Sequence, residues 1–201
     1  MSDFNKMVAL CEAGALLHAN GWTPATSGNC SARRDETSMW VTATGVSIGS
    51  LAMDDILIAG LDGVAVEPAR RASAESALHG HLYRLKPKVG AVLHTHAPNA
   101  TVASMLFGDS VDLAGFELVK AFEGITSHEV TLRVPIVDNH QDMAVLCERV
   151  EQVIATVDPC WGVLIRGHGL YAWGSTLNDT LRHLEAFEFL FGCAVAIRGS
   201  R

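Results

Sequence analysis

Hydrophobic residues recur along this chain at two spacings, one typical of helices and one typical of strands. Near the start, Met7, Leu10, Gly14 and Leu17 follow helical spacing, and we expect a helix over about residues 3–19. A longer amphipathic pattern predicts a helix from Thr176 to about Ile197. Similar patterns predict further helices over residues 73–85, 99–107, 116–122 and 143–157.

Short apolar or alternating runs between Gly- and Asp-bearing turns predict strands. They lie at residues 30–33, 39–43, 56–59, 89–94, 130–137 and 161–166. Strands and helices alternate, but hairpin-like runs cluster early, which favours a mixed α/β sheet sandwiched by helices over a purely parallel one. There is no internal repeat, low-complexity segment or linker, so we expect residues 1–201 to form a single domain.

Composition narrows the functional classes. The 201 residues are 49% hydrophobic and 18% charged, as in a packed globular protein. A net charge of −7 argues against nucleic acid or anionic membrane as partner, because both reward a basic patch. No apolar run reaches the ~18 residues of a membrane span, and residues 1–6 lack a secretory signal pattern. Five widely spaced cysteines without a C-x-x-C motif predict free thiols and a cytoplasmic protein.

Three histidines form the first candidate site. His94 and His96 end an apolar run, and strand residues two apart point to the same face. His168 follows a second apolar run, in the stretch Arg166-Gly167-His168. Three imidazoles from separate elements make an open zinc site, although iron, cobalt, nickel and manganese also accept them. From these residues alone, hydrogen-bonded structural histidines remain an equal alternative.

A second His-x-His pair, His79 and His81, has the same spacing. It falls in a predicted helix, where residues two apart do not face each other. We therefore do not expect these two histidines to share a metal ion.

Small polar residues at turns form the second candidate site. Residues 26–31 read Thr-Ser-Gly-Asn-Cys-Ser, Thr44-Gly45 follows a predicted strand, and Ser73 opens a predicted helix as a possible N-cap. Small residues let backbone N–H groups approach an anion closely, and a helix N-terminus favours negative charge. Singly, each feature is an ordinary turn or cap; together they can form a phosphate cradle.

Two carboxylates are candidates for proton transfer. Glu75 lies just inside a predicted helix start, and Glu117 lies within residues 115–120. A carboxylate beside a bound substrate can act as a general acid or base. Most glutamates are solvated surface groups, however, and their own surroundings in the sequence do not single out these two.

In this order and spacing, the motifs resemble the class II aldolase/adducin family over nearly the whole chain. The matching pieces are Ser27-Gly28-Asn29, Thr44-Gly45, Ser73-Ala74-Glu75, His94-Thr95-His96 and residues 166–170. The resemblance implies a three-layer α/β/α fold with a mixed, mostly antiparallel sheet of the nine-stranded type. It also implies a homotetramer with active sites near subunit contacts.

The resemblance further implies roles for individual residues. It assigns one zinc ion per subunit to His94, His96 and His168. It places the phosphate of a sugar phosphate substrate near Ser27, Gly28, Asn29, Thr44, Gly45 and Ser73. The paired serines of the aldolases appear here as Ser73-Ala74, so one phosphate donor is missing or replaced.

Two branches of the family differ in the acid they use. In the sugar-phosphate aldolases the acid at the Glu75 position is catalytic, and in a dehydratase branch it is the acid matching Glu117. This chain has both and is most similar to the dehydratase branch, so we expect a lyase that removes water from a ketose 1-phosphate. An aldolase is the nearest alternative, and a pentulose-phosphate epimerase is disfavoured by the apolar Ala97 after His96. An adducin-like assembly module without activity is disfavoured because all three histidines are present.

Overall fold

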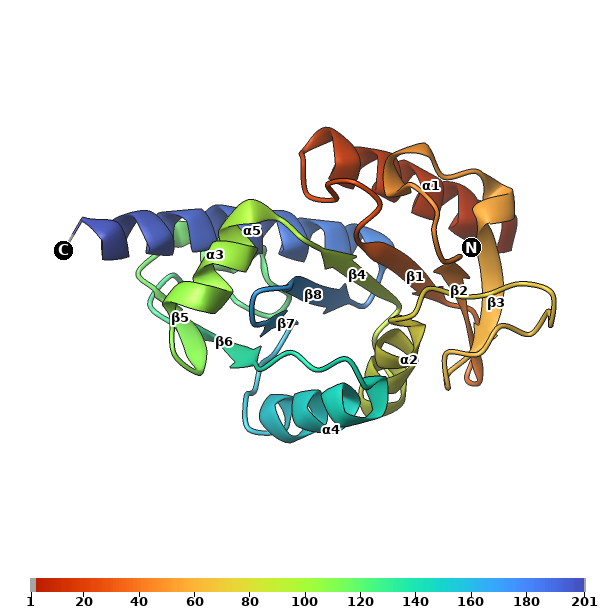
Figure 1. The fold of residues 1–201 in the computed structure, drawn as a ribbon. Coiled ribbons are helices and arrows are strands. Elements are labelled where there is room, and N and C mark those ends of the chain that lie inside the picture. Colours follow the sequence, from red (N-terminus) through yellow and green to blue (C-terminus); the bar gives the residue numbers. More distant parts are fainter. Residues whose placement is uncertain (1–2, 201) are drawn as a thin grey trace.

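The computed structural model describes residues 3–200, which form one eight-stranded sheet with helices on both faces (Figure 1). Met1, Ser2 and Arg201 lie outside the described residues. The strands are β1 (Asn29–Arg33), β2 (Ser38–Thr42), β3 (Ile56–Gly60), β4 (Ala91–Thr95), β5 (Ser110–Ala114), β6 (Thr131–Val137), β7 (Gly162–Ile165) and β8 (Gly169–Gly174). The helices are α1 (Asp3–Ala19), α2 (Ser76–Leu85), α3 (Pro98–Leu106), α4 (Met143–Ile154) and α5 (Leu177–Gly199), with short 3₁₀ helices η1 (Ile48–Ser50), η2 (Met53–Asp55) and η3 (Glu117–Ala121).

The sheet is mixed and mostly antiparallel, as expected. Its order is β3-β2-β1-β4-β8-β7-β6-β5, and among the described residues β6 and β7 are the one parallel pair. The expected nine-stranded type is wrong for residues 3–200, which have eight strands. Residues 64–72 run beside β2 and β3 but make only single bridges, from Ala65 to Ala59 and from Ala72 to Ala43. Pro68 in this segment cannot donate a ladder hydrogen bond.

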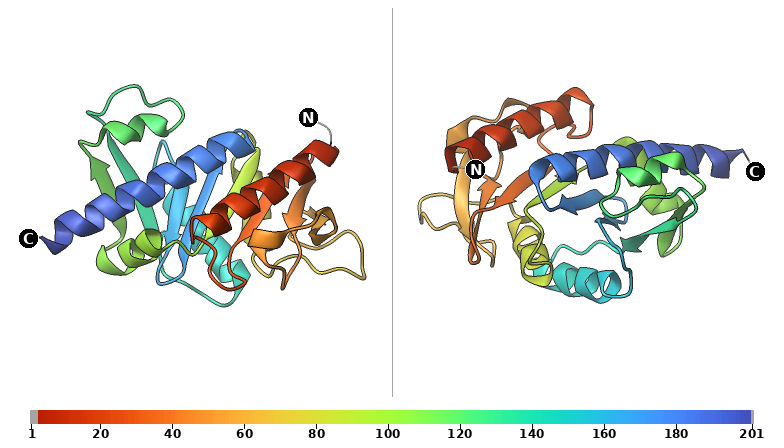
Figure 2. Two further views of the ribbon diagram at one scale, coloured as in Figure 1. Left: turned by 90° about the horizontal axis from the view of Figure 1, so that it is seen from above. Right: turned by 180° about the vertical axis from the view of Figure 1, so that it is seen from behind.

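The sheet and the helices on its two faces form three layers, with a hydrophobic core on each face of the sheet (Figures 1 and 2). One core lies between the sheet and the layer of α1, α3 and α5, and its largest side chains include Phe187 and Phe191 of α5. The other lies between the sheet and the layer of α2 and α4, with Leu82 and Val150 fully buried. No helix within residues 3–200 combines the length and apolar character needed to cross a bilayer.

Strand direction determines which loops meet. Both β4 and β7 pair antiparallel with β8, so β4 and β7 end at the same end of the sheet, where β8 begins. By the same antiparallel pairing, β1 begins and β2 finishes at that end. We refer to it as the carboxyl end of β4. In contrast, β5 runs against β6 and therefore finishes at the opposite end.

Most predicted elements are confirmed to within a few residues, with three corrections. The helix expected from Ser73 begins at Ser76, because the backbone N–H of Ser73 donates to Thr42 O (3.1 Å) and ties this segment to β2. Ser73 is therefore not the N-cap; Glu75 occupies that position. Residues 116–122 form the 3₁₀ helix η3 and not an α-helix, and the strands β5 and β8 were not predicted. The prediction of free thiols is confirmed, since all five cysteines are free.

Candidate metal centre

The three predicted metal ligands meet at the carboxyl end of β4. His94 is the penultimate residue of β4, His96 follows the strand, and His168 lies in the turn between β7 and β8. Their ring centroids lie 4.6–4.8 Å apart, and one ligand nitrogen from each lies within 4.8 Å of the others. The Nε2 atoms of His94 and His96 are 3.0 Å apart. The donor set is therefore that of a three-histidine metal site.

His94 is held in the form that a metal requires. Its Nδ1–H donates to Leu170 O on the neighbouring strand (3.0 Å), which leaves the Nε2 lone pair directed toward the other two histidines. His94 is fully buried, and this burial lowers its pKa to about 3 against the opposing effect of Glu75. Burial also lowers the pKa of His96. Both rings are therefore neutral at physiological pH, as ligation requires.

Glu75 joins the histidines from the N-cap position of α2. Its Oε1 lies 2.9 Å from Nε2 of His168, and its Oε2 lies 3.4 Å from Nε2 of His94 and accepts a hydrogen bond from Asn29 Nδ2 (2.6 Å). Burial alone would raise the pKa of Glu75, but His94, His168 and the Asn29 hydrogen bond lower it below its usual range. Glu75 is thus an ionised carboxylate at the centre, able to act as a fourth ligand or as a base.

The other predicted substrate-binding residues gather at the same end of the sheet. Ser27, Gly28 and Asn29 precede or begin β1, Thr44 and Gly45 follow β2, and Ser73 precedes α2. Gly28 has a φ of +82°, and a Cβ there would lie 2.8 Å from His94 O, so a side chain would disturb the strand that carries His94.

The structure does not bring Glu117 into this group. Glu117 follows β5, which finishes at the opposite end of the sheet, four strands from β4. Its side chain is 70% exposed and forms an ion pair with Lys120, with His128 3.5 Å away. The Lys120 contact lowers the pKa of Glu117. Within its own chain, Glu117 cannot serve the three-histidine centre.

His79 and His81 do not form a metal site. Nδ1 of His79 faces Ser31 Oγ (2.7 Å), while Nε2 of His81 faces Glu151 (3.0 Å). Both residues lie in α2, so the helix geometry directs the two rings apart, as expected.

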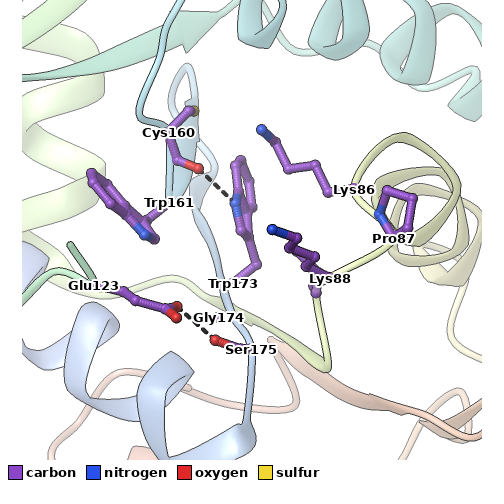
Figure 3. Close-up of a pocket in the computed structure, with 10 residues that line it drawn as sticks. Lys86, Pro87, Lys88, Glu123, Cys160, Trp161, Trp173, Gly174 and Ser175 are labelled. Atoms are coloured by element: carbon purple, nitrogen blue, oxygen red, sulfur yellow. Dashed lines mark hydrogen bonds between the residues drawn. The ribbon is translucent and has the colours of Figure 1, made fainter.

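An open pocket of about 770 Å³ lies at the other end of the sheet (Figure 3). It is lined in part by Lys86, Lys88, Trp161 and Trp173, and Trp173 donates its indole N–H to Cys160 O (2.8 Å). None of the predicted site residues lines it. The candidate chemical centre is therefore the group of His94, His96, His168 and Glu75, and not this pocket.

Sequence reasoning missed one contact and one residue at the centre. Asn29 was predicted as a phosphate ligand, but its amide contacts Glu75, 46 positions away, a pairing that no local pattern reveals. Tyr171 was not predicted at all; its ring stacks on His94 with centroids 4.0 Å apart and planes at 16°. The one sequence signal for Tyr171 is its position three residues after His168.

The sequence is similar to those of known proteins over nearly its whole length. A family model for the class II aldolase and adducin N-terminal domain matches residues 8–195. Methylthioribulose-1-phosphate dehydratase of Pseudomonas aeruginosa (strain LESB58) is 49% identical over 189 residues, which cover 94% of this chain and 92% of that protein. The protein of the same name from Pseudomonas syringae pv. syringae (strain B728a) is 47% identical over 199 residues and 98% of both chains.

Solved structures share the fold. An L-fuculose 1-phosphate aldolase superposes with a TM-score of 0.82 at 20% sequence identity, over 99% of this chain and 89% of that one. This likeness independently supports the three-layer arrangement of sheet and helices described above. With a family model matched from residue 8 to residue 195, the chain belongs to the class II aldolase and adducin N-terminal domain family.

Proposed function

We propose that this chain is a zinc-dependent methylthioribulose-1-phosphate dehydratase of the methionine salvage pathway, acting in the cytoplasm as a single-domain subunit of a homotetramer. The observation that carries the proposal is the convergence of His94, His96 and His168 beside Glu75. Relatives at 47–49% identity over nearly the whole chain carry the dehydratase name, which supports the choice of reaction. Free cysteines are consistent with a reducing compartment.

The metal would be held by Nε2 of the three histidines, which are the neutral nitrogen donors that zinc prefers. A divalent cation at this position supplies Lewis-acid stabilisation of the negative charge that develops on the substrate during proton removal. Each of the remaining tasks falls to side chains and backbone groups of the protein itself.

The substrate phosphate would bind to Ser27, Gly28, Asn29, Thr44, Gly45 and Ser73. These residues offer hydroxyl, amide and backbone N–H donors at the carboxyl end of β4. Holding the phosphate there places the sugar carbons beside the histidines and removes much of the entropic cost of alignment.

Loss of water requires a proton to leave C3 and a hydroxide equivalent to leave C4. A carboxylate accepts the C3 proton, and the C4 hydroxyl departs with a proton as water; the enol that remains relaxes to 2,3-diketo-5-methylthiopentyl 1-phosphate. Glu117 is our preferred acid/base, and Glu75 holds the ligand set and shares the proton chemistry. Because Glu117 is exposed at the far end of its own sheet, we assign it to the centre of a second copy of the chain.

Metal removal tests this function. Protein treated with a chelator and dialysed should lose dehydration of 5-methylthioribulose 1-phosphate, and added Zn²⁺ should restore it, with the diketone detected by mass spectrometry. Elemental analysis of the untreated protein should find about one zinc per chain. Full activity in chelator-treated, zinc-free protein would contradict the proposal.

A class II aldolase is the second candidate, because the fold is shared with an L-fuculose 1-phosphate aldolase and Glu75 lies at the centre. The two reactions give different products. Retro-aldol cleavage releases dihydroxyacetone phosphate or an aldehyde, which a coupled assay detects, whereas dehydration keeps the carbon chain intact.

A further inference from the structure

Tyr171 lies directly beside the metal centre because of strand register. It is the partner of His94 in the antiparallel pairing of β4 with β8. Directly opposed residues project from the same face of a sheet, so the two rings stack, with centroids 4.0 Å apart and planes at 16°. Leu170, the preceding residue of β8, accepts the Nδ1–H of His94. Two successive residues of β8 therefore support one histidine of β4.

The hydroxyl of Tyr171 lies close to the Glu75 carboxylate of the site. Tyr171 is fully buried, and its hydroxyl makes no hydrogen bond within residues 3–200. A phenol hydroxyl is a hydrogen-bond donor in neutral solution, so it calls for an acceptor nearby. A buried donor without a partner is costly, and the Glu75 carboxylate, which packs against the same histidine, is the acceptor that would offset this cost.

We propose that Tyr171 is a positioning residue of the centre, with two separable actions. Its ring fixes the plane of the His94 imidazole, and its hydroxyl steadies the carboxylate of Glu75 against His94 and His168. The inference rests on the proposed function, in that it assumes that a metal binds to the three histidines.

The two actions predict different consequences. Loss of the ring frees the His94 imidazole to rotate and weakens metal binding. Loss of the hydroxyl alone leaves the ligand plane intact, but it allows the Glu75 carboxylate to turn away from the centre. Tyr171 acts on His94 and Glu75 and not directly on the residues proposed to bind phosphate, so KM should change little.

The chain offers a matched control, because its other tyrosine, Tyr83, is equally buried. The Tyr83 hydroxyl contacts Ser31 Oγ (2.8 Å), on the far side of His79 from Tyr171. Tyr83→Phe therefore removes a buried hydroxyl from the same core without touching a metal ligand.

The experiment compares Tyr171→Phe, Tyr171→Leu and Tyr83→Phe. Zinc affinity is measured by competition with a chromophoric chelator, with Zn²⁺ alone as the probe, and kcat and KM are measured with 5-methylthioribulose 1-phosphate. Tyr171→Leu should weaken zinc binding roughly 10- to 100-fold, the range found for groups that orient metal ligands. Tyr171→Phe should keep zinc affinity within about threefold and lower kcat about 10-fold at unchanged KM. Tyr83→Phe should alter neither quantity.

Two results would overturn the inference. One is a zinc affinity of Tyr171→Leu equal to that of Tyr83→Phe. The other, which holds even if the leucine variant does not fold, is a kcat of Tyr171→Phe equal to that of wild type. Failure of the proposed function would look different from both results, because wild-type protein would then bind zinc without dehydrating this substrate. The zinc affinities of Tyr171→Leu and Tyr83→Phe would still decide the role of the ring.

Discussion

Burial and neighbouring groups together set the charge states of single side chains at the centre. His94 is neutral because it is fully buried, whereas Glu75 is ionised despite burial because two histidines and Asn29 surround it. The same burial acts on His79, which lies behind Tyr171 with its Nδ1 against Ser31 Oγ. In the folded protein the imidazole of His79 is therefore neutral in mild acid, whereas an unfolded chain would protonate it.

This difference in protonation between the folded and unfolded states predicts that the free energy of unfolding depends on pH. Burial lowers the pKa of His79 to about 4, below the ~6.5 of an unfolded chain, so the unfolded state binds the extra proton. The contribution is complete above pH ~6.5 and is lost as the pH falls toward 4, by about 1.4 kcal/mol per unit. Wild type should exceed His79→Asn in free energy of unfolding at pH 7, and the gap should narrow by pH 5. Urea titrations at both pH values measure this, and a gap independent of pH would refute it.

At the scale of elements, the centre depends on close approach between β4 and β8. Gly169 begins β8, and a Cβ at this position would overlap the carbonyl oxygen of Thr95, next to His96. Packing between the two strands thus requires a residue without a side chain at position 169. This position directly follows His168 in the β7–β8 turn.

We predict that Gly169→Ala separates the two strands and costs about 1–3 kcal/mol, as overpacking does. Because His96 and His168 flank the contact, zinc affinity should fall as well. Gly108→Ala is the control, since a Cβ there meets no atom within 4 Å. Thermal unfolding and chelator competition should distinguish the two variants; equal behaviour would show that the strand contact tolerates a methyl group.

At the scale of the whole molecule, the chain places its two candidate acids at opposite ends of one sheet. Glu75 lies at the carboxyl end of β4, and Glu117 lies beyond the end of β5. A closed ring of subunits can bring opposite ends of neighbouring copies together. The proposed homotetramer would complete each centre in this way.

Co-expression of two inactive variants tests this arrangement. Glu117→Gln and His96→Ala should each be inactive alone, because each lacks one half of the centre. Mixed oligomers should regain about a quarter of wild-type turnover, since half the centres keep the histidine and half of those face an intact Glu117. His96→Ala with His168→Ala is the control and should regain nothing, since both changes affect the same centre. Glu117→Gln with full zinc and normal turnover would remove Glu117 from the mechanism.

Local pattern was sufficient for most elements of this fold. The helix from Thr176 was predicted from its apolar stripe, and Thr176 is the N-cap whose side chain accepts from Asp179 N (3.1 Å). The short strand β8 begins and ends with glycine, a residue typical of turns, and it was not predicted. The helix start at Ser73 was wrong because a hydrogen bond to β2 overrides the capping preference of serine.

By itself, the sequence predicted the candidate ligands and the pairing of His94 with His96, because residues two apart in extended backbone at the end of a strand point to the same side. Tertiary structure decided that His168 joins them, that Asn29 and Tyr171 support the centre, and that Glu75 lies within it while Glu117 does not. These contacts link residues up to 93 positions apart and depend on strand order and register. Spacing along the chain indicates which face of a strand a residue occupies. Only the folded sheet brings residues that are distant in the sequence into contact.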